Sequence, residues 1–149
     1  MSISPTFSTR DIEEYVAKRA ERVHEAVLYY LNYAGVKAVN EVRLKGNYTD
    51  RSRNLRGSTG YLIVYNGQVV SGGGFEPIDG GGVDGTRIGR DYALQLANHE
   101  GQGYVLIVVA GMHYASYVAA RGYDVLQSGK LLAEHLVPRL MEKLKAKLQ

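Results

Sequence analysis

The sequence predicts an α+β domain in which a small antiparallel sheet packs with a long N-terminal helix, a middle helix and a C-terminal helix. Three observations support this fold class: an apolar stripe at helical spacing, an Asn-Gly pair between two β-rich runs, and an unbroken apolar run between two glycines. With 149 residues, 45% hydrophobic and 22% charged, the chain is expected to form one domain over residues 1–149.

The first helix is expected from about Arg10 to Leu44, with Thr9 as its N-cap and Gly46 as its end. It would extend ~50 Å, and Gly35 is a position where it could bend. A helix this long usually packs on more than its own sheet. Coiled-coil pairing is the alternative, although the stripe is rich in Ala and Val and not in Leu or Ile. Apolar residues recur at steps of four and three: Val16, Ala20, Val23, Val27, Leu31, Ala34, Ala38 and Val42.

The sheet is predicted from two local patterns. Asn66-Gly67 lies between β-rich runs and predicts a hairpin over 61–71, because a type I′ turn needs positive φ at both central residues. Residues 104–110 are apolar without a break, which predicts a strand covered on both faces and hence the central strand of the sheet. A polar loop is expected over 47–58.

A glycine-rich segment over 72–89 contains eight of the 18 glycines together with Pro77 and several acids, and predicts a flexible arm or loop. A middle helix is expected over 86–100, a short helix or turn over 114–121, and the last helix over 127–148. Pro138 predicts a kink or a restart in that last helix. Its buried side is expected to carry Leu131, Leu132, His135, Leu136, Leu140 and Leu144.

Composition excludes several function classes. The chain has no cysteine, so it can form no disulfide and no thiolate metal site. Its longest apolar run is far shorter than the ~20 residues that span a bilayer, and residues 1–9 lack the apolar core of a signal peptide, so we expect no membrane contact. The four histidines show no metal-binding spacing, and we expect no metal and no cofactor.

The glycines at 80, 82 and 85 match a dinucleotide fingerprint, but no apolar strand runs into them and two adjacent acids, Asp79 and Asp84, would repel phosphate. The acids of this segment do not match the ligand spacing of an EF-hand loop either. The one pairing suited to general base chemistry is His113 with Asp124, and a structural histidine at a strand end is the more common case. We therefore expect no catalytic residue, with a small enzyme using His113 as a less favoured alternative.

Two further patterns concern surfaces. Basic residues gather over 43–56, and a nucleic-acid-binding module is an alternative reading of Arg43, Lys45, Arg51, Arg53 and Arg56, although a solvated face is the simpler one. The chain has 12 tyrosines and no tryptophan, and tyrosine suits surfaces that are buried on assembly. Tyr29, Tyr30 and Tyr33 would contact either their own sheet or another subunit, and a second contact surface is expected at Tyr114, Tyr117 and Tyr123.

Four segments taken together carry a resemblance: Ala34 to Arg43, Tyr48-Thr49-Asp50 leading to Asn54-Leu55-Arg56-Gly57-Ser58, the hairpin at 60–70, and Tyr114-Ala115-Ser116-Tyr117-Val118. In this order they resemble the neck, or tail-component, proteins of tailed bacteriophages, which are encoded in the head–tail joining cassette and are related to lambda-like minor tail protein Z. The form that continues into 121–125 is most similar to versions from phages and prophages of Bacteroides-type bacteria. The family often has a glutamate where this chain has Ala119, which leaves open what Arg56 pairs with.

The resemblance implies a structural virion protein that forms a homo-oligomeric ring in the neck, completes the tail and joins it to the head connector. The expected partners are further copies of the chain, connector or head-closure proteins, and the tail tube or tail terminator. DNA would pass nearby without sequence-specific binding, and the chain would be in the host cytoplasm during assembly. The residues 72–89 would order on assembly. The expected subunit-interface residues are Tyr29, Tyr30, Tyr33, Arg53, Arg56, Tyr114, Tyr117 and Tyr123.

Overall fold

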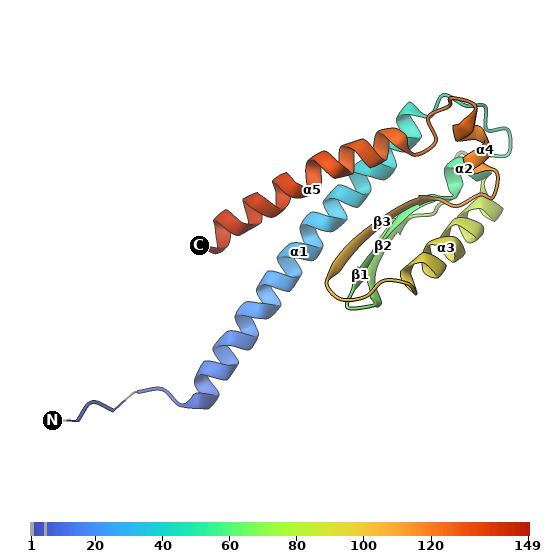
Figure 1. The fold of residues 1–149 in the computed structure, drawn as a ribbon. Helices are drawn as coiled ribbons and strands as arrows, with labels where there is room; N and C mark the ends of the chain where they lie inside the picture. The colour runs from blue at the N-terminus through green and yellow to red at the C-terminus, as the bar shows by residue number, and fades with distance from the viewer. Residues whose placement is uncertain (1, 5) are drawn as a thin grey trace.

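A computed structural model describes residues 2–4 and 6–149 and confirms the α+β class. The sheet has α1 and α5 on one face and α3 on the other (Figure 1). The elements are α1 (Thr9–Lys45), α2 (Asn54–Gly57), β1 (Thr59–Tyr65), β2 (Gln68–Gly74), α3 (Val83–Ala97), β3 (Tyr104–Ala110), α4 (Ala115–Ala120) and α5 (Gln127–Leu148).

A capping box begins α1 one residue earlier than expected. Ser8, not Thr9, is the N-cap: its hydroxyl accepts the Asp11 N–H at 3.2 Å, and the Asp11 carboxylate accepts the Ser8 N–H at 2.8 Å. These hydrogen bonds also lower the pKa of Asp11. At the other end Gly46 is the C-cap, as expected, and its N–H donates to the Val42 carbonyl.

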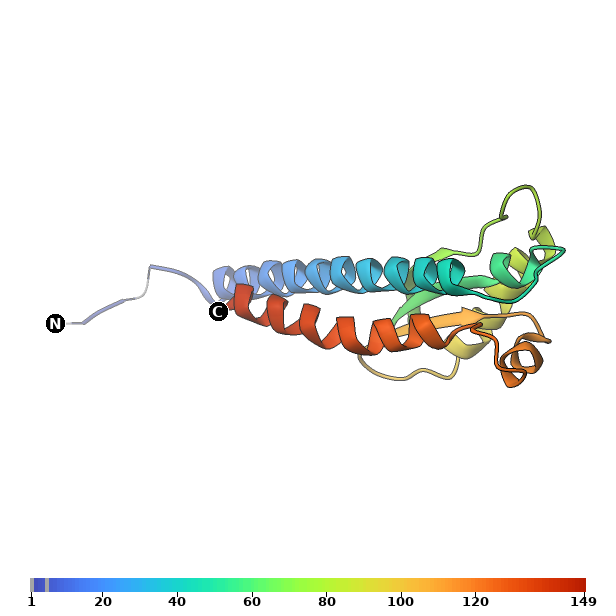
Figure 2. The same ribbon diagram turned by 90° about the horizontal axis from the view of Figure 1, so that it is seen from above.

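The N-terminal third of α1 projects beyond the sheet (Figures 1 and 2). Every residue over 9–22 is exposed, including Val16 and Ala20, which belong to the predicted apolar stripe. From Val27 to Val42 the same stripe is buried under α5 and the sheet. The helix continues through Gly35, whose missing side chain leaves room for the Tyr61 ring against the helix backbone.

The strand order is β2-β1-β3, so the expectation that 104–110 is the central strand is wrong: β3 is an edge strand and β1 is central. An edge strand also reads as a continuous apolar run when both of its faces are covered, here by α1 and α5 on one side and α3 on the other. The hairpin is confirmed, with φ of 49° at Asn66 and 81° at Gly67.

Alternate residues of β1 supply the two halves of the core. Tyr61 and Ile63 pack with α1 and with Leu144 of α5. Leu62 and Val64 pack with small residues of α3, Ala93 and Ala97. These small side chains let α3 lie close to the sheet, where it also packs on Val105, Ile107 and Val109 of β3.

The glycine-rich segment 72–89 contains more regular structure than expected. Its first three glycines belong to β2 and residues 83–89 belong to α3, which leaves a connection over 75–82. There Phe75 is buried, and Ile78 and Gly81 exchange two backbone hydrogen bonds. The expected polar loop over 47–58 contains the short helix α2.

Helix α5 continues through Pro138, so the predicted restart does not occur. Leu131 and His135 are exposed, contrary to the expected buried side, whereas Leu140 and Leu144 pack on α1 as expected. The difference arises because the side of α5 that packs on α1 carries Gly129, which lies against Ala38 and Val42, and then Val137, Leu140 and Leu144, so Leu131 and His135 lie outside this side. Among the helices that the structure describes, none has the length and hydropathy needed to cross a membrane.

Candidate assembly surfaces

The outward face of α1 carries the first candidate surface. Tyr29 and Tyr33 are 68% and 44% exposed, and Val36 is 46% exposed. Their spacing of four and three residues places them on one side of the helix, away from the buried stripe. The Lys37 ammonium lies 5.5 Å from the centre of the Tyr33 ring. Tyr29, Tyr33 and Val36 are called the α1 tyrosine surface below.

The structure places Tyr30 inside the protomer, where its ring contacts the exposed ring of Tyr29 edge-on with the centres 5.5 Å apart. It is 8% exposed, its hydroxyl accepts a hydrogen bond from the Lys147 ammonium at 3.1 Å, and it packs between α1 and α5. Tyr30 thus connects the two helices within one chain and does not extend the α1 tyrosine surface.

A second surface lies at α4. Tyr117 and Tyr123 are 62% and 44% exposed, and the Arg121 guanidinium donates to the Tyr117 hydroxyl at 3.0 Å. Tyr114 is half-buried in the cluster beneath α4, and burial raises its pKa. Tyr117 and Tyr123, called the α4 tyrosine surface, are therefore available for contact, whereas Tyr114 mainly supports them.

A cleft of about 700 Å³ opens beside this second surface. It separates the outer edge of β3 and one side of α3 from α4 and the start of α5. Most of its lining is apolar, with Asp124 and Lys130 as its charged members. The lining includes Tyr92, Leu96, Val108, Val109, Ala110, Ala115, Ser116, Ala119, Tyr123, Val125 and Leu126.

Arg56 has partners within its own chain. Its guanidinium donates to the Gly46 carbonyl at 2.9 Å, lies 4.5 Å from the centre of the Tyr48 ring, and approaches the Asp50 carboxylate at 4.0 Å. Arg56 therefore ties the end of α1 to α2 without a glutamate at position 119. Arg53 is exposed, with a left-handed φ of 61°.

The basic segment 43–56 offers fewer free charges than its sequence suggests. Arg43 donates to Glu76 at 2.8 Å and to the Thr59 carbonyl, and Lys45 pairs with Glu41 at 2.7 Å. With Arg56 held internally, Arg51 and Arg53 are the members of this segment left for contacts with phosphate.

The structure does not join His113 and Asp124 by a hydrogen bond among the described residues. His113 is exposed and packs edge-on against Tyr114. Asp124 accepts the Ser128 N–H at 3.2 Å at the start of α5, and its own N–H donates to Asn47. Over residues 2–4 and 6–149, no three His, Cys, Asp or Glu side chains gather as a metal site.

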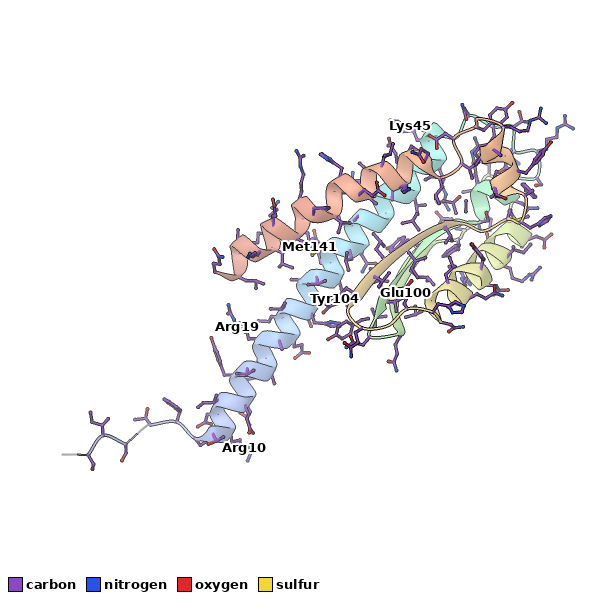
Figure 3. All side chains as sticks on the ribbon, viewed as in Figure 1. Arg10, Arg19, Lys45, Glu100, Tyr104 and Met141 are labelled. Carbon is purple, nitrogen blue, oxygen red and sulfur yellow. The ribbon has the colours of Figure 1, made fainter. Side chains whose placement is uncertain are left out.

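An aromatic cluster that the sequence did not reveal joins α1 to one end of the sheet. Tyr65 and Tyr104 stack with ring centres 4.4 Å apart, and His24 contacts both, with its Nδ1 2.5 Å from the Tyr104 hydroxyl. Figure 3 shows Tyr104 near α1, with Arg19 and Arg10 on the part of α1 that projects past it. The sequence alone did not predict this cluster because it depends on the pairing of Tyr65 in β1 with Tyr104 in β3.

Comparison with known proteins gives no relative: no protein-family model, curated protein or solved structure matches the chain.

Proposed function

We propose that this chain is a structural virion protein of a tailed phage, of the Bacteroides-type neck or tail-completion kind, that forms a ring joining the head connector to the tail. This proposal starts from the resemblance to neck proteins. Four segments carry that resemblance: 34–43, 48–58, 60–70 and 114–118. The proposed partners are further copies, connector or head-closure proteins, and the tail tube or tail terminator. No turnover and no cofactor belong to this role.

The observation that carries the proposal is the presence of two separate exposed aromatic surfaces on one small chain. The α1 tyrosine surface and the α4 tyrosine surface belong to different elements, and each exposes rings that are more than two-fifths accessible. A ring of identical chains needs two different faces on each protomer, since each copy contacts its two neighbours by heterologous contacts. Tyrosine suits such faces because its ring is apolar and its hydroxyl remains hydrated before assembly.

The surfaces can be tested by adding a charge at the centre of one of them. In the Tyr29→Lys variant an ammonium would be buried at the subunit contact, so we expect the oligomer to dissociate at concentrations where the wild type stays assembled. Leu131→Lys is the matched control, because Leu131 is 55% exposed on α5 outside both surfaces. Sedimentation velocity measures both variants, and an equal effect of the two would remove the α1 tyrosine surface from the interface.

The virion role itself is tested in the phage or prophage that encodes the chain. Without the gene, we expect DNA-filled heads and separate tails in electron micrographs, and joining should return when purified protein is added to the lysate. Infectious particles formed in the absence of the chain would contradict the proposed function.

A further inference from the structure

We propose that the segment 2–8 of one copy adds as a fourth strand to the outer edge of β3 in a second copy, with its apolar side chains in the 700 Å³ cleft. This N-terminal segment, and not the glycine-rich segment 72–89, is called the arm below. The inference deepens the proposed ring and rests on it, because it identifies one contact between neighbouring protomers. Two features without partners in the described protomer support it: the open edge of β3 and the exposed residues 2–4 and 6–8 of the arm.

The outer edge of β3 has backbone groups ready for another strand. The Gly111 N–H donates to the Ser58 carbonyl and the Gly103 carbonyl accepts from the Asn66 N–H, so the odd-numbered residues of β3 direct their backbone N–H and C=O groups toward β1. In an antiparallel ladder the residues between them direct these backbone groups to the other edge of the strand. Val108 and Ala110 therefore turn their N–H and C=O groups away from β1, and both line the cleft. Within the described residues, no strand pairs with this edge.

The arm has the sequence pattern of a half-buried strand. Residues 2–8 read Ser-Ile-Ser-Pro-Thr-Phe-Ser, so apolar and polar residues alternate without exception. Ile3 and Phe7 are 95% and 56% exposed, and residues 6–8 lead away from the molecule at the free end of α1 (Figures 1 and 2). Proline is tolerated in a strand at a sheet edge, which is the position that the arm would take. Peptides that bind by strand addition gain affinity from the main chain and specificity from alternate side chains.

The arm cannot reach the cleft of its own chain. Helix α1 has 37 residues and is about 55 Å long at 1.5 Å per residue. The cleft lies at its far end, where Asn47 is part of the lining. Seven extended residues reach at most about 25 Å. The occupant must therefore be the arm of a second copy, and the contact is head-to-tail, as closure of a ring requires.

The first test changes the apolar side of the arm without changing its length. We expect the Ile3→Ser, Phe7→Ser double variant to raise the concentration for half-assembly at least about tenfold, since the two anchors are lost from the cleft. The matched control Ser4→Ala, Thr6→Ala alters the polar side and should leave assembly unchanged. Both variants keep Ser8 as the cap of α1, and an unchanged melting temperature checks the fold. Assembly that is equal in all three proteins would overturn the inference.

The second test locates the arm directly. Because the chain has no cysteine, a variant carrying Ile3→Cys, on the side of the arm that enters the cleft, and Ser116→Cys, in the cleft lining, has a single engineered pair per contact. Oxidation should give a ladder of covalent oligomers, whereas Ile3→Cys with Gln68→Cys, on β2, should give none. The absence of a ladder in the first variant, or equal ladders in both, would overturn the inference. Rings that form without arm cross-links would leave the proposed function standing, and cross-linked oligomers that never join particles would contradict the function alone.

Discussion

At the residue scale, positions without a side chain explain how closely α1 approaches the sheet. A Cβ at Gly35 would overlap the ring of Tyr61, whose hydroxyl donates to Asn32 of the same helix at 2.8 Å. We expect Gly35→Ala to lower the free energy of unfolding by roughly 1–3 kcal/mol, the range for overpacked cores, despite the better helix propensity of alanine. Chemical denaturation measures the loss. Gly101→Ala, where nothing lies within 4 Å of the added methyl, is the control.

The buried hydroxyl of Tyr48 makes the free energy of unfolding depend on pH in the alkaline range. Burial raises its pKa to about 12, and the hydroxyl has no hydrogen-bond partner among residues 2–4 and 6–149. In the unfolded chain a tyrosine ionises near pH 10, so between about pH 10 and 12 the unfolded state loses its proton first and stability falls as pH rises. Below pH 10 this contribution is constant.

We therefore expect Tyr48→Phe to lose less stability than the wild type between pH 9 and pH 11, because the phenyl ring has no proton to release. At pH 7 the variant should be as stable as the wild type or slightly more stable, since an unpartnered polar atom is removed from the core. Urea denaturation at the two alkaline pH values gives the comparison. Parallel losses in both proteins would show that Tyr48 does not titrate differently in the folded state.

At the element scale, α1 divides into a covered part and a projecting part. Residues 9–22 are all exposed, and Arg19 connects this part to α5 by donating to the Leu148 carbonyl at 2.8 Å. We expect amides over 12–22 of the unassembled protein to exchange with solvent at least about a hundredfold faster than those over 30–42, because local opening there uncovers no core. Hydrogen-exchange mass spectrometry measures both ranges. Equal protection in the monomer would mean that the projecting part is covered.

The same division shows what the sequence could and could not predict. The hairpin is confirmed because the Asn66-Gly67 turn is set by local backbone chemistry. The bounds of α1 were close for the same reason, but its apolar stripe continues through Val16 and Ala20 without any sign that the sheet ends before them. The position of β3 at an edge depends on long-range pairing, which no local pattern encodes. The exposure of Tyr29 and Tyr33 and the burial of Tyr30 likewise depend on where α5 packs.

At the scale of the whole molecule, the chain is asymmetric from end to end. Residues 6–8 and the projecting part of α1 lie at one end, and α4 and the start of α5 lie at the other (Figures 1 and 2). The cleft and the α4 tyrosine surface belong to this second end, since α4 and the start of α5 contribute to the cleft lining. Such a protomer suits head-to-tail contacts between copies, in which unlike surfaces meet. The mild net charge of +3 adds no strong field that would hold DNA within a ring.

Weak DNA binding is the corresponding prediction. With Arg43, Lys45 and Arg56 paired within the chain, Arg51 and Arg53 are the members of the basic segment left for phosphate contacts. We expect the log–log salt dependence of binding to duplex DNA to have a slope of magnitude about 2 or less. Fluorescence anisotropy at several salt concentrations gives this slope. A magnitude near 5, lowered by Arg51→Ala and Arg53→Ala, would favour the nucleic-acid-binding alternative.

The mass of the assembled protein tests the central claim most directly. Native mass spectrometry of the purified chain, from low micromolar to several hundred micromolar, should show one dominant species at a fixed multiple of the 16.4 kDa protomer. That multiple should stay constant as concentration rises, because a closed ring has no free end to extend. A chain that remains monomeric across this range, alone and mixed with tails, would contradict the account.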